Sequence, residues 1–151
     1  SCNPLYPNIM AIKILDHGSK DYQKMVEMRY NILRKPLGLT FSPEELAREK
    51  EDILIGCFEE DKLEGCCLLT KTNPTTVKLR QMAVTSGLQG KGIGRVLLVF
   101  AENIARDKGF KKITMNARKN ALGFYDKLGY KVVGDEFLEV TLPHFTMEKE
   151  L

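Results

Sequence analysis

Hydrophobic and polar positions follow two different periods along the chain. Residues 9–15 form a mostly apolar run with several β-branched side chains, which is typical of a strand. From Ser19 to about Arg34, apolar residues recur every three or four positions, which predicts a helix capped by Ser19. Ser42 and Pro43, followed by two glutamates, predict a short second helix, because a serine cap, an early proline and acidic side chains all favour a helix N-terminus.

Beyond Asp52 the pattern is mainly that of strands. Three strands are expected at residues 53–58, 63–70 and 76–84, separated by short polar turns that favour an antiparallel meander. The further elements expected are a helix from about Ile93 to Ala105, a short buried strand at 113–115, a helix from about Ala117 to Leu128, and strands at 130–140 and 145–149 joined through Leu142, Pro143 and His144. The pattern therefore predicts an α/β (α+β) fold with about seven strands and about four helices.

The length of 151 residues fits a single domain that spans residues 1–151. No apolar run approaches the roughly 20 residues that a bilayer requires, so no membrane span is expected. Residues 1–10 lack the basic start and the apolar stretch of a signal peptide, which favours a cytoplasmic location. The net charge of +3 is spread along the chain and gives no reason to expect binding to nucleic acid.

The cysteines fit a reducing compartment. Cys57, Cys66 and Cys67 lie inside apolar strand segments, where a free thiol behaves as a small hydrophobic side chain. No C-x-x-C motif or Cys/His cluster has the spacing of a metal site. We therefore expect buried thiols and no bound metal.

A glycine-rich turn after the strand that ends at Val84 is the most informative segment. Gly90, Gly92 and Gly94 let the backbone bend sharply and approach a ligand, and the amides of the helix that follows carry a partial positive charge. This arrangement predicts an anion site that suits a pyrophosphate. A dinucleotide motif G-x-G-x-x-G is excluded because Arg95 replaces its last glycine, and a Walker A loop needs Ser or Thr after its lysine.

The segment from Gln89 to Gly94 resembles the Q-x-x-G-x-G signature of the GNAT superfamily of N-acetyltransferases. Residues 120–130 resemble the family's later helix, which carries an F-Y-x-x-x-G-F/Y pattern. Ala117, Arg118 and residues 143–147 are similar to the ElaA-like branch, whose acceptors are poorly defined. The resemblance covers nearly the whole chain and implies the GNAT fold, with a central mixed, mostly antiparallel, twisted sheet.

The resemblance implies that acetyl-CoA is the cosubstrate. The backbone of Met82, Ala83 and Val84 is expected to pair with the pantetheine arm like an added strand. The residues expected to wrap the pyrophosphate are Gln89, Gly90, Lys91, Gly92, Ile93, Gly94 and Arg95. The side chains of Lys91 and Arg95 either reach the phosphates or face water, and the sequence does not decide between these two alternatives. Asn116 and Asn120 lie where the family contacts the cofactor, although Arg118 stands at the position where the family commonly has Asn.

Transfer to an amine needs a base, an oxyanion donor and an acid. Tyr125 is the candidate acid, because a phenol can protonate a leaving thiolate and this position can face a cleft while Phe124 faces the core. A backbone N–H near Val84 is the expected oxyanion donor. His144 is the first candidate for the base, with a structural histidine as the alternative, and Glu136 and Glu139 are weaker candidates. Six charged or aromatic residues on the first two helices are expected to flank the acceptor entrance: Arg29, Tyr30, Arg34, Glu44, Glu45 and Glu49.

The sequence thus predicts an N-acetyltransferase that acts on a primary amine of a small molecule or protein, by direct attack within a ternary complex. A non-catalytic acyl-CoA sensor or interaction module is the alternative. The acceptor is not identified by the sequence, and both a monomer and a homodimer remain open.

Overall fold

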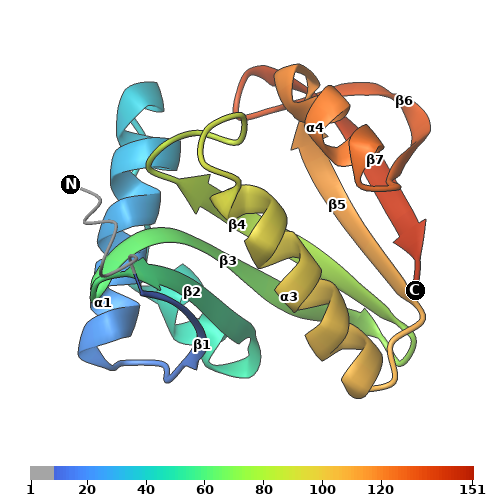
Figure 1. Ribbon diagram of the computed structural model, residues 1–151. Helices are drawn as coiled ribbons and strands as arrows, with labels where there is room; N and C mark the ends of the chain where they lie inside the picture. Colours follow the sequence, from blue (N-terminus) through green and yellow to red (C-terminus); the bar gives the residue numbers. More distant parts are fainter. Residues whose placement is uncertain (1–8) are drawn as a thin grey trace.

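The strands form one sheet in the order β1-β2-β3-β4-β5-β7-β6 in the computed structural model, which describes residues 9–151 (Figure 1). All neighbouring strands are antiparallel except β4 and β5, which are parallel. The strand bounds are β1 Met10–Leu15, β2 Ile53–Glu59, β3 Lys62–Asn73, β4 Thr76–Val84, β5 Lys112–Arg118, β6 Lys131–Glu139 and β7 Leu142–Glu150. The mixed, mostly antiparallel sheet of seven strands predicted from the sequence is confirmed.

The first two α-helices begin where the sequence predicts caps. The Ser19 hydroxyl accepts a hydrogen bond from the Tyr22 amide, and Ser42 and Glu45 form a reciprocal capping box. The α-helices are α1 Lys20–Arg29, α2 Pro43–Arg48, α3 Ile93–Asp107 and α4 Leu122–Lys127. The chain after α1 continues as a π-helix, η1 (Tyr30–Arg34), and shorter 3₁₀ turns are η2 Lys35–Leu37, η3 Glu49–Glu51 and η4 Lys119–Ala121. Within residues 9–151, none of these helices is both long and apolar enough to span a bilayer.

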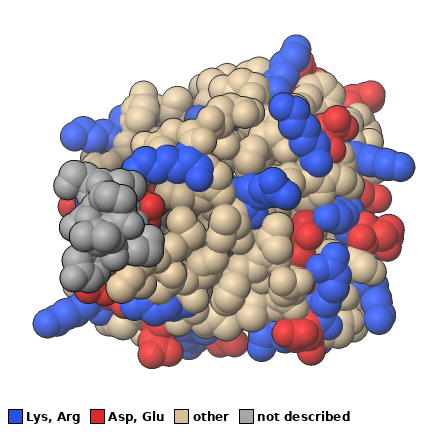
Figure 2. Space-filling model, viewed as in Figure 1, with Lys and Arg blue, Asp and Glu red and all other residues tan. Residues whose placement is uncertain are grey.

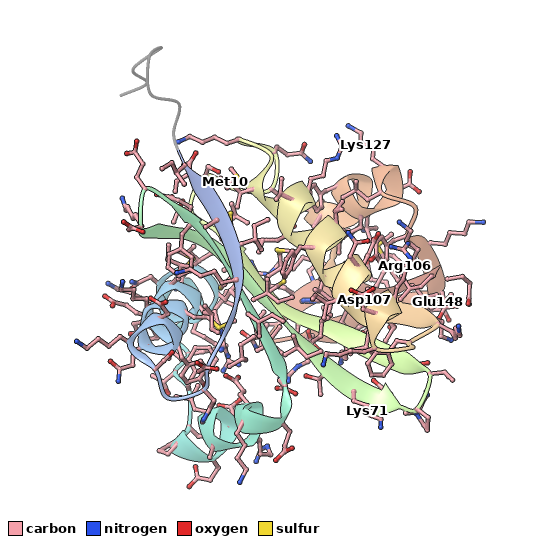
Figure 3. The ribbon with its side chains drawn as sticks, turned by 60° about the horizontal axis from the view of Figure 1, so that its bottom comes forward. Met10, Lys71, Arg106, Asp107, Lys127 and Glu148 are labelled. Atoms are coloured by element: carbon pink, nitrogen blue, oxygen red, sulfur yellow. The ribbon has the colours of Figure 1, made fainter. Side chains whose placement is uncertain are left out.

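The sheet separates two hydrophobic cores. On one face α3 and α4 pack on the sheet through Leu97, Ala101 and Phe124, and on the other face α1 packs through Tyr22 and Met25. Figure 3 shows α1 and α3 on opposite sides of the strands. The three cysteines predicted to be buried thiols are buried and free, whereas Cys2 lies outside the described residues.

Two element boundaries predicted from the sequence are wrong. The helix expected from Ala117 begins later, because Ala117 and Arg118 pair with Phe145 and His144 of β7 and thereby extend β5. The link expected at residues 142–144 is instead the start of β7. The actual turn is Val140–Thr141, with φ of 47° and 65°, in a pair of residues that seldom adopts this conformation and so gives no turn signal.

Candidate functional site

Strands β4 and β5 pair over only three residues and then diverge. Residues 76–78 pair with residues 112–114, and beyond Lys78 the two strands separate, as Figure 1 shows. The edge of β4 from Leu79 to Val84 that faces β5 therefore lacks a strand partner. A cavity of about 700 Å³ lies at this divergence, and both strands line it.

A β-bulge lies in the same part of β4. Gln81 has a φ of 58°, and Gln81 and Met82 together stand opposite Cys67 of β3. The extra residue reverses the alternation of side chains, because Leu79 packs in the core under α3 whereas Ala83 packs in the core under α1. The sequence gives no sign of this bulge, since glutamine is not a residue that favours positive φ.

The glycine-rich turn leads into the N-terminus of α3. Gly92 is the N-cap with a φ of 82° and open space around its missing Cβ, and the helix has no side-chain cap. The first amides of α3 therefore point outward without a partner from the helix itself. At the other two glycines a side chain would collide with neighbouring atoms of the chain itself. A Cβ on Gly90 would lie 2.4 Å from the Ser86 carbonyl oxygen, and one on Gly94 would lie 3.2 Å from the Phe124 ring. Gly90 and Gly94 therefore have a packing reason within the chain, Gly92 has open space beside it, and the expectation that the three glycines let the backbone approach a ligand stays a prediction.

The residues predicted to bind the cofactor divide into two groups. Those that line the cavity are Met82, Ala83, Val84, Gln89, Asn116, Asn120 and Tyr125. Those that form the adjacent turn and the start of α3, outside the cavity lining, are Gly90, Lys91, Gly92, Ile93, Gly94 and Arg95. Lys91 is exposed and its ammonium lies 3.9 Å from the Glu59 carboxylate, while Arg95 is exposed on α3.

Tyr125 reaches the cavity from α4. Its ring makes edge contacts with Phe124 and Tyr130, at centroid distances of 5.0 and 6.0 Å, and only 5% of the residue is exposed. The hydroxyl has no hydrogen-bond partner among residues 9–151, yet it is not sealed inside the protein, so it opens onto the cavity. Burial, together with the nearby Cys67, raises the pKa of Tyr125 above its ordinary value, so the hydroxyl remains protonated at neutral pH.

His144 lines the cavity from β7. Its Nδ1 lies 2.8 Å from the Leu142 carbonyl oxygen, which can only accept, so Nδ1 carries the proton and donates it. In the neutral ring the lone pair is then on Nε2, which lies 3.5 Å from a Glu139 carboxylate oxygen. The ring stacks on Phe137, which fixes its orientation. An oriented imidazole whose neutral form has its lone pair on Nε2 has the properties of a general base.

The two glutamates proposed as weaker bases differ in position. Glu139 lines the cavity, and its carboxylate accepts a hydrogen bond from Asn116 at 3.3 Å. Asn116 is held in turn by Thr146, whose hydroxyl donates to its side-chain oxygen. Glu136 lies outside the cavity lining and forms an exposed ion pair with Lys119 at 2.9 Å. Of these two carboxylates, only Glu139 is placed to influence a bound ligand.

Of the six residues expected at the acceptor entrance, Arg34 lines the cavity. Arg29 and Glu49, however, lie outside the cavity lining and are buried, with 0% and 3% of each residue exposed, so the prediction is wrong for this pair. The Arg29 guanidinium donates two hydrogen bonds to Glu49, at 2.8 and 2.6 Å, and Tyr22 donates a third at 2.7 Å. Tyr30, Glu44 and Glu45 lie outside the cavity lining. An amphipathic helix pattern cannot distinguish an exposed charge from one paired in the interior.

The buried pair ties α1 to η3. Burial favours the neutral form of Glu49, but the hydrogen bonds from Arg29 and Tyr22 outweigh it and lower the pKa of this carboxyl. Tyr22 shows the opposite effect, because burial and the bond to Glu49 raise its pKa. The ion pair therefore persists at neutral pH and fixes the helix from which η1 continues toward the cavity.

Structures of similar shape are acetyltransferases. Escherichia coli ElaA superposes with a TM-score of 0.79 at 17% identity, and the match covers 94% of this chain and 100% of that one. An aminoglycoside 6′-N-acetyltransferase complexed with coenzyme A superposes with a TM-score of 0.77 at 19% identity, covering 93% and 96%. At these identities the likeness shows the fold, and the predicted ElaA-like branch stays a prediction.

Sequence relatives match over a shorter stretch. The uncharacterized protein YyaT of Bacillus subtilis is 33% identical over 76 residues, which cover 50% of this chain and 51% of that protein. The chain thus spans about half the length of the curated relatives that it matches. Residues 37–151, well over half of the chain, match the family described as the acetyltransferase (GNAT) domain, and the chain belongs to this family.

Proposed function

We propose that this chain is an acetyl-CoA-dependent N-acetyltransferase that transfers an acetyl group to a primary amine. The observation that carries the proposal is the unpaired edge of β4 from Leu79 to Val84, which lines a cavity and leads to the uncapped N-terminus of α3. Backbone amides and carbonyls of a strand edge can hydrogen-bond an extended chain with amide groups. A helix N-terminus can bind phosphates. The two sites are arranged in the order in which the pantetheine arm and the pyrophosphate are joined in coenzyme A.

The cavity fits this cosubstrate in size as well as in chemistry. A volume of about 700 Å³ is within the range of pockets that bind small molecules and cofactors. When bound, acetyl-CoA supplies an acetyl group activated as a thioester. We propose that Met82, Ala83 and Val84 bind the arm, that residues 89–95 bind the pyrophosphate, and that Asn116 and Asn120 contribute side-chain contacts.

Three groups of the chain serve the reaction. His144 accepts through Nε2 the proton that the amine loses as its nitrogen bonds to the acetyl carbon. A backbone N–H between Met82 and Val84, oriented by the bulge, donates to the oxygen that gains negative charge. Tyr125 acts as the acid by donating a hydrogen bond to the sulfur as the carbon–sulfur bond breaks, and the thiolate takes up a proton from solvent as coenzyme A leaves. The products are the acetylated amine and coenzyme A with a free thiol.

The location and organisation are also proposals. We infer a cytoplasmic protein in which this chain acts as a single domain. One sheet connects residues 10 to 150, and three buried free thiols are typical of a reducing compartment.

The alternative is a module that binds an acyl-CoA but does not transfer the acyl group. A cavity-facing tyrosine and an oriented histidine argue against it, because a binding module needs neither. In Figure 2 basic and acidic side chains are intermixed on the face shown, and they form no single-sign stripe such as nucleic-acid binding requires.

Calorimetric titration with acetyl-CoA tests the binding part of the proposal, and release of the coenzyme A thiol in the presence of amines tests transfer. We expect saturable binding and amine-dependent release. No heat at millimolar acetyl-CoA with folded protein would refute the whole assignment, whereas binding without release across broad amine panels would support the binding module.

A further inference from the structure

The charged side chains that line the cavity are mostly basic. Within the described residues, Glu139 is the one acidic residue in the lining, which also includes four basic residues. These four, here called the cationic wall, are Arg34, Lys78, Arg80 and Arg118. The sign of the charges that line a cleft predicts the charge of its ligand, because a low-dielectric wall of one sign concentrates ligands of the other sign.

Three members of the cationic wall lie on the face of the sheet away from α3. Val77 and Leu79 pack in the core under α3, so the intervening Lys78, and Arg80 beyond it, point to the face covered by α1. Leu68, which pairs with Arg80 across β3 and β4, packs in the α1 core and supports this placement. Arg34 reaches the same face from η1, directly after α1.

Lys78, on β4, is too far from the glycine-rich turn to serve the phosphates. Lys78 precedes Val84 by six residues of strand, and at about 3.3 Å per residue the two lie roughly 20 Å apart along β4. The turn and the start of α3 follow Val84. Lys78 and Arg80 therefore lie on the opposite side of the bulge from the phosphate site, where the amine acceptor has to bind.

Protein carboxylates neutralise only part of this charge. Arg34 lies 3.6 Å from Glu45, and Arg80 lies 3.9 Å from Asp52, distances that are long for ion pairs. Lys78 and Arg118 have no ion pair with any residue from 9 to 151. Glu139, the opposing carboxylate, already has Asn116 and His144 as neighbours.

We propose that the acceptor is a small primary amine that also carries a carboxylate. Lys78 and Arg80 bind the carboxylate, and the amine contacts His144. This inference rests on the proposed acetyl transfer and adds the class of acceptor. A second ammonium group on the acceptor would face the cationic wall and be repelled. The structure thus favours an amino acid over a polyamine or an aminoglycoside.

The test compares acceptors that differ in one terminal group. Linear ω-amino acids of three to six carbons are assayed beside their carboxamides and the α,ω-diamines of equal length, with acetyl-CoA saturating. For the longer chains the amine keeps an ordinary pKa near 10.4, so differences in rate report the other end of the molecule. We expect kcat/KM to favour the best amino acid over its carboxamide by about tenfold or more, as loss of a charged hydrogen bond predicts. The preference should weaken with added salt.

Two matched variants locate the effect. Lys78→Gln should reduce the preference for the carboxylate several-fold, whereas Lys71→Gln, which removes an exposed charge on the neighbouring strand, should leave it unchanged (Figure 3). Equal or better use of carboxamides or diamines by the unmodified protein would overturn the inference while transfer itself stands. A preference that survives Lys78→Gln and Arg80→Gln would also overturn it. If no amine of any class were acetylated, the proposed function would fail and the inference with it.

Discussion

Removing the Tyr125 hydroxyl should slow transfer without weakening the fold. Tyr125→Phe keeps the ring and its edge contacts with Phe124 and Tyr130, and the hydroxyl has no protein partner to lose among the described residues. The expected change in unfolding free energy is therefore below about 1 kcal/mol. Acetyl-CoA affinity should also change little, because the hydroxyl acts on the sulfur only when the bond breaks.

The size of the rate effect follows from the raised pKa of Tyr125. A phenol whose pKa lies above 10 is a weaker acid than an alkyl thiol, whose pKa is about 8.5, so it acts mainly by hydrogen-bonding the developing thiolate. A hydrogen bond to a charged group contributes about 1.5–3 kcal/mol. At 1.36 kcal/mol for each factor of ten, kcat should fall about 10- to 150-fold. The raised pKa also means that deprotonation of Tyr125 should cause no loss of rate below about pH 10.

Tyr130 supplies the matched control, because the same substitution there should lower stability and leave the rate of transfer unchanged. Its hydroxyl donates to Glu102 at 2.8 Å and Tyr130 lies outside the cavity lining, so Tyr130→Phe should cost about 1.5–3 kcal/mol of stability and leave kcat nearly unchanged. Thermal unfolding and thiol release are measured for both variants. Unchanged kcat in Tyr125→Phe, or loss of acetyl-CoA affinity in parallel with kcat, would refute the acid role.

Three further changes test other parts of the site. Glu49→Gln should lower the unfolding free energy by about 3–5 kcal/mol at pH 7, because it leaves the Arg29 charge buried without its partner. The lowered pKa of Glu49 means that this contribution is present above the carboxyl's unfolded pKa of about 4.3 and is lost as the pH falls, so the two proteins should converge in stability toward pH 3 in denaturant titrations. Gly92→Ala, at a φ of 82°, should cost about 1–2 kcal/mol and weaken acetyl-CoA binding measured by calorimetry, while Gly123→Ala in open space on α4 should do neither. His144→Gln should lower kcat/KM for amines and leave the acetyl-CoA dissociation constant unchanged. An unchanged rate would refute the role of His144 as the base and indicate a structural one.

The parts of this structure that follow from local chemistry could be predicted from the sequence. Ser42 and Glu45 cap a helix because of their own side chains, and the apolar runs separated by polar turns in residues 53–84 predict three strands. The bulge at Gln81 could not be predicted, since its positive φ is imposed by pairing with β3 and the sequence shows no glycine there. The burial of Arg29 likewise depends on Glu49, twenty residues away, and no helical periodicity reveals such a partner.

Features that depend on distant pairing also explain how β4 can bind both the cosubstrate and the acceptor in the proposed function. A regular strand would direct residues 78, 80 and 82 to one face, and the edge toward β5 would be occupied along its whole length. Here pairing with β5 stops after Lys78, which frees the edge, and the bulge that begins three residues later reverses the side-chain alternation. Side chains before the bulge can therefore bind an acceptor on the α1 face, while the backbone after it stays available for an extended arm that leads to α3. Neither feature belongs to the glycine-rich motif, so in the proposed function the motif supplies the phosphate site and the unpaired, bulged part of β4 determines where the two substrates meet.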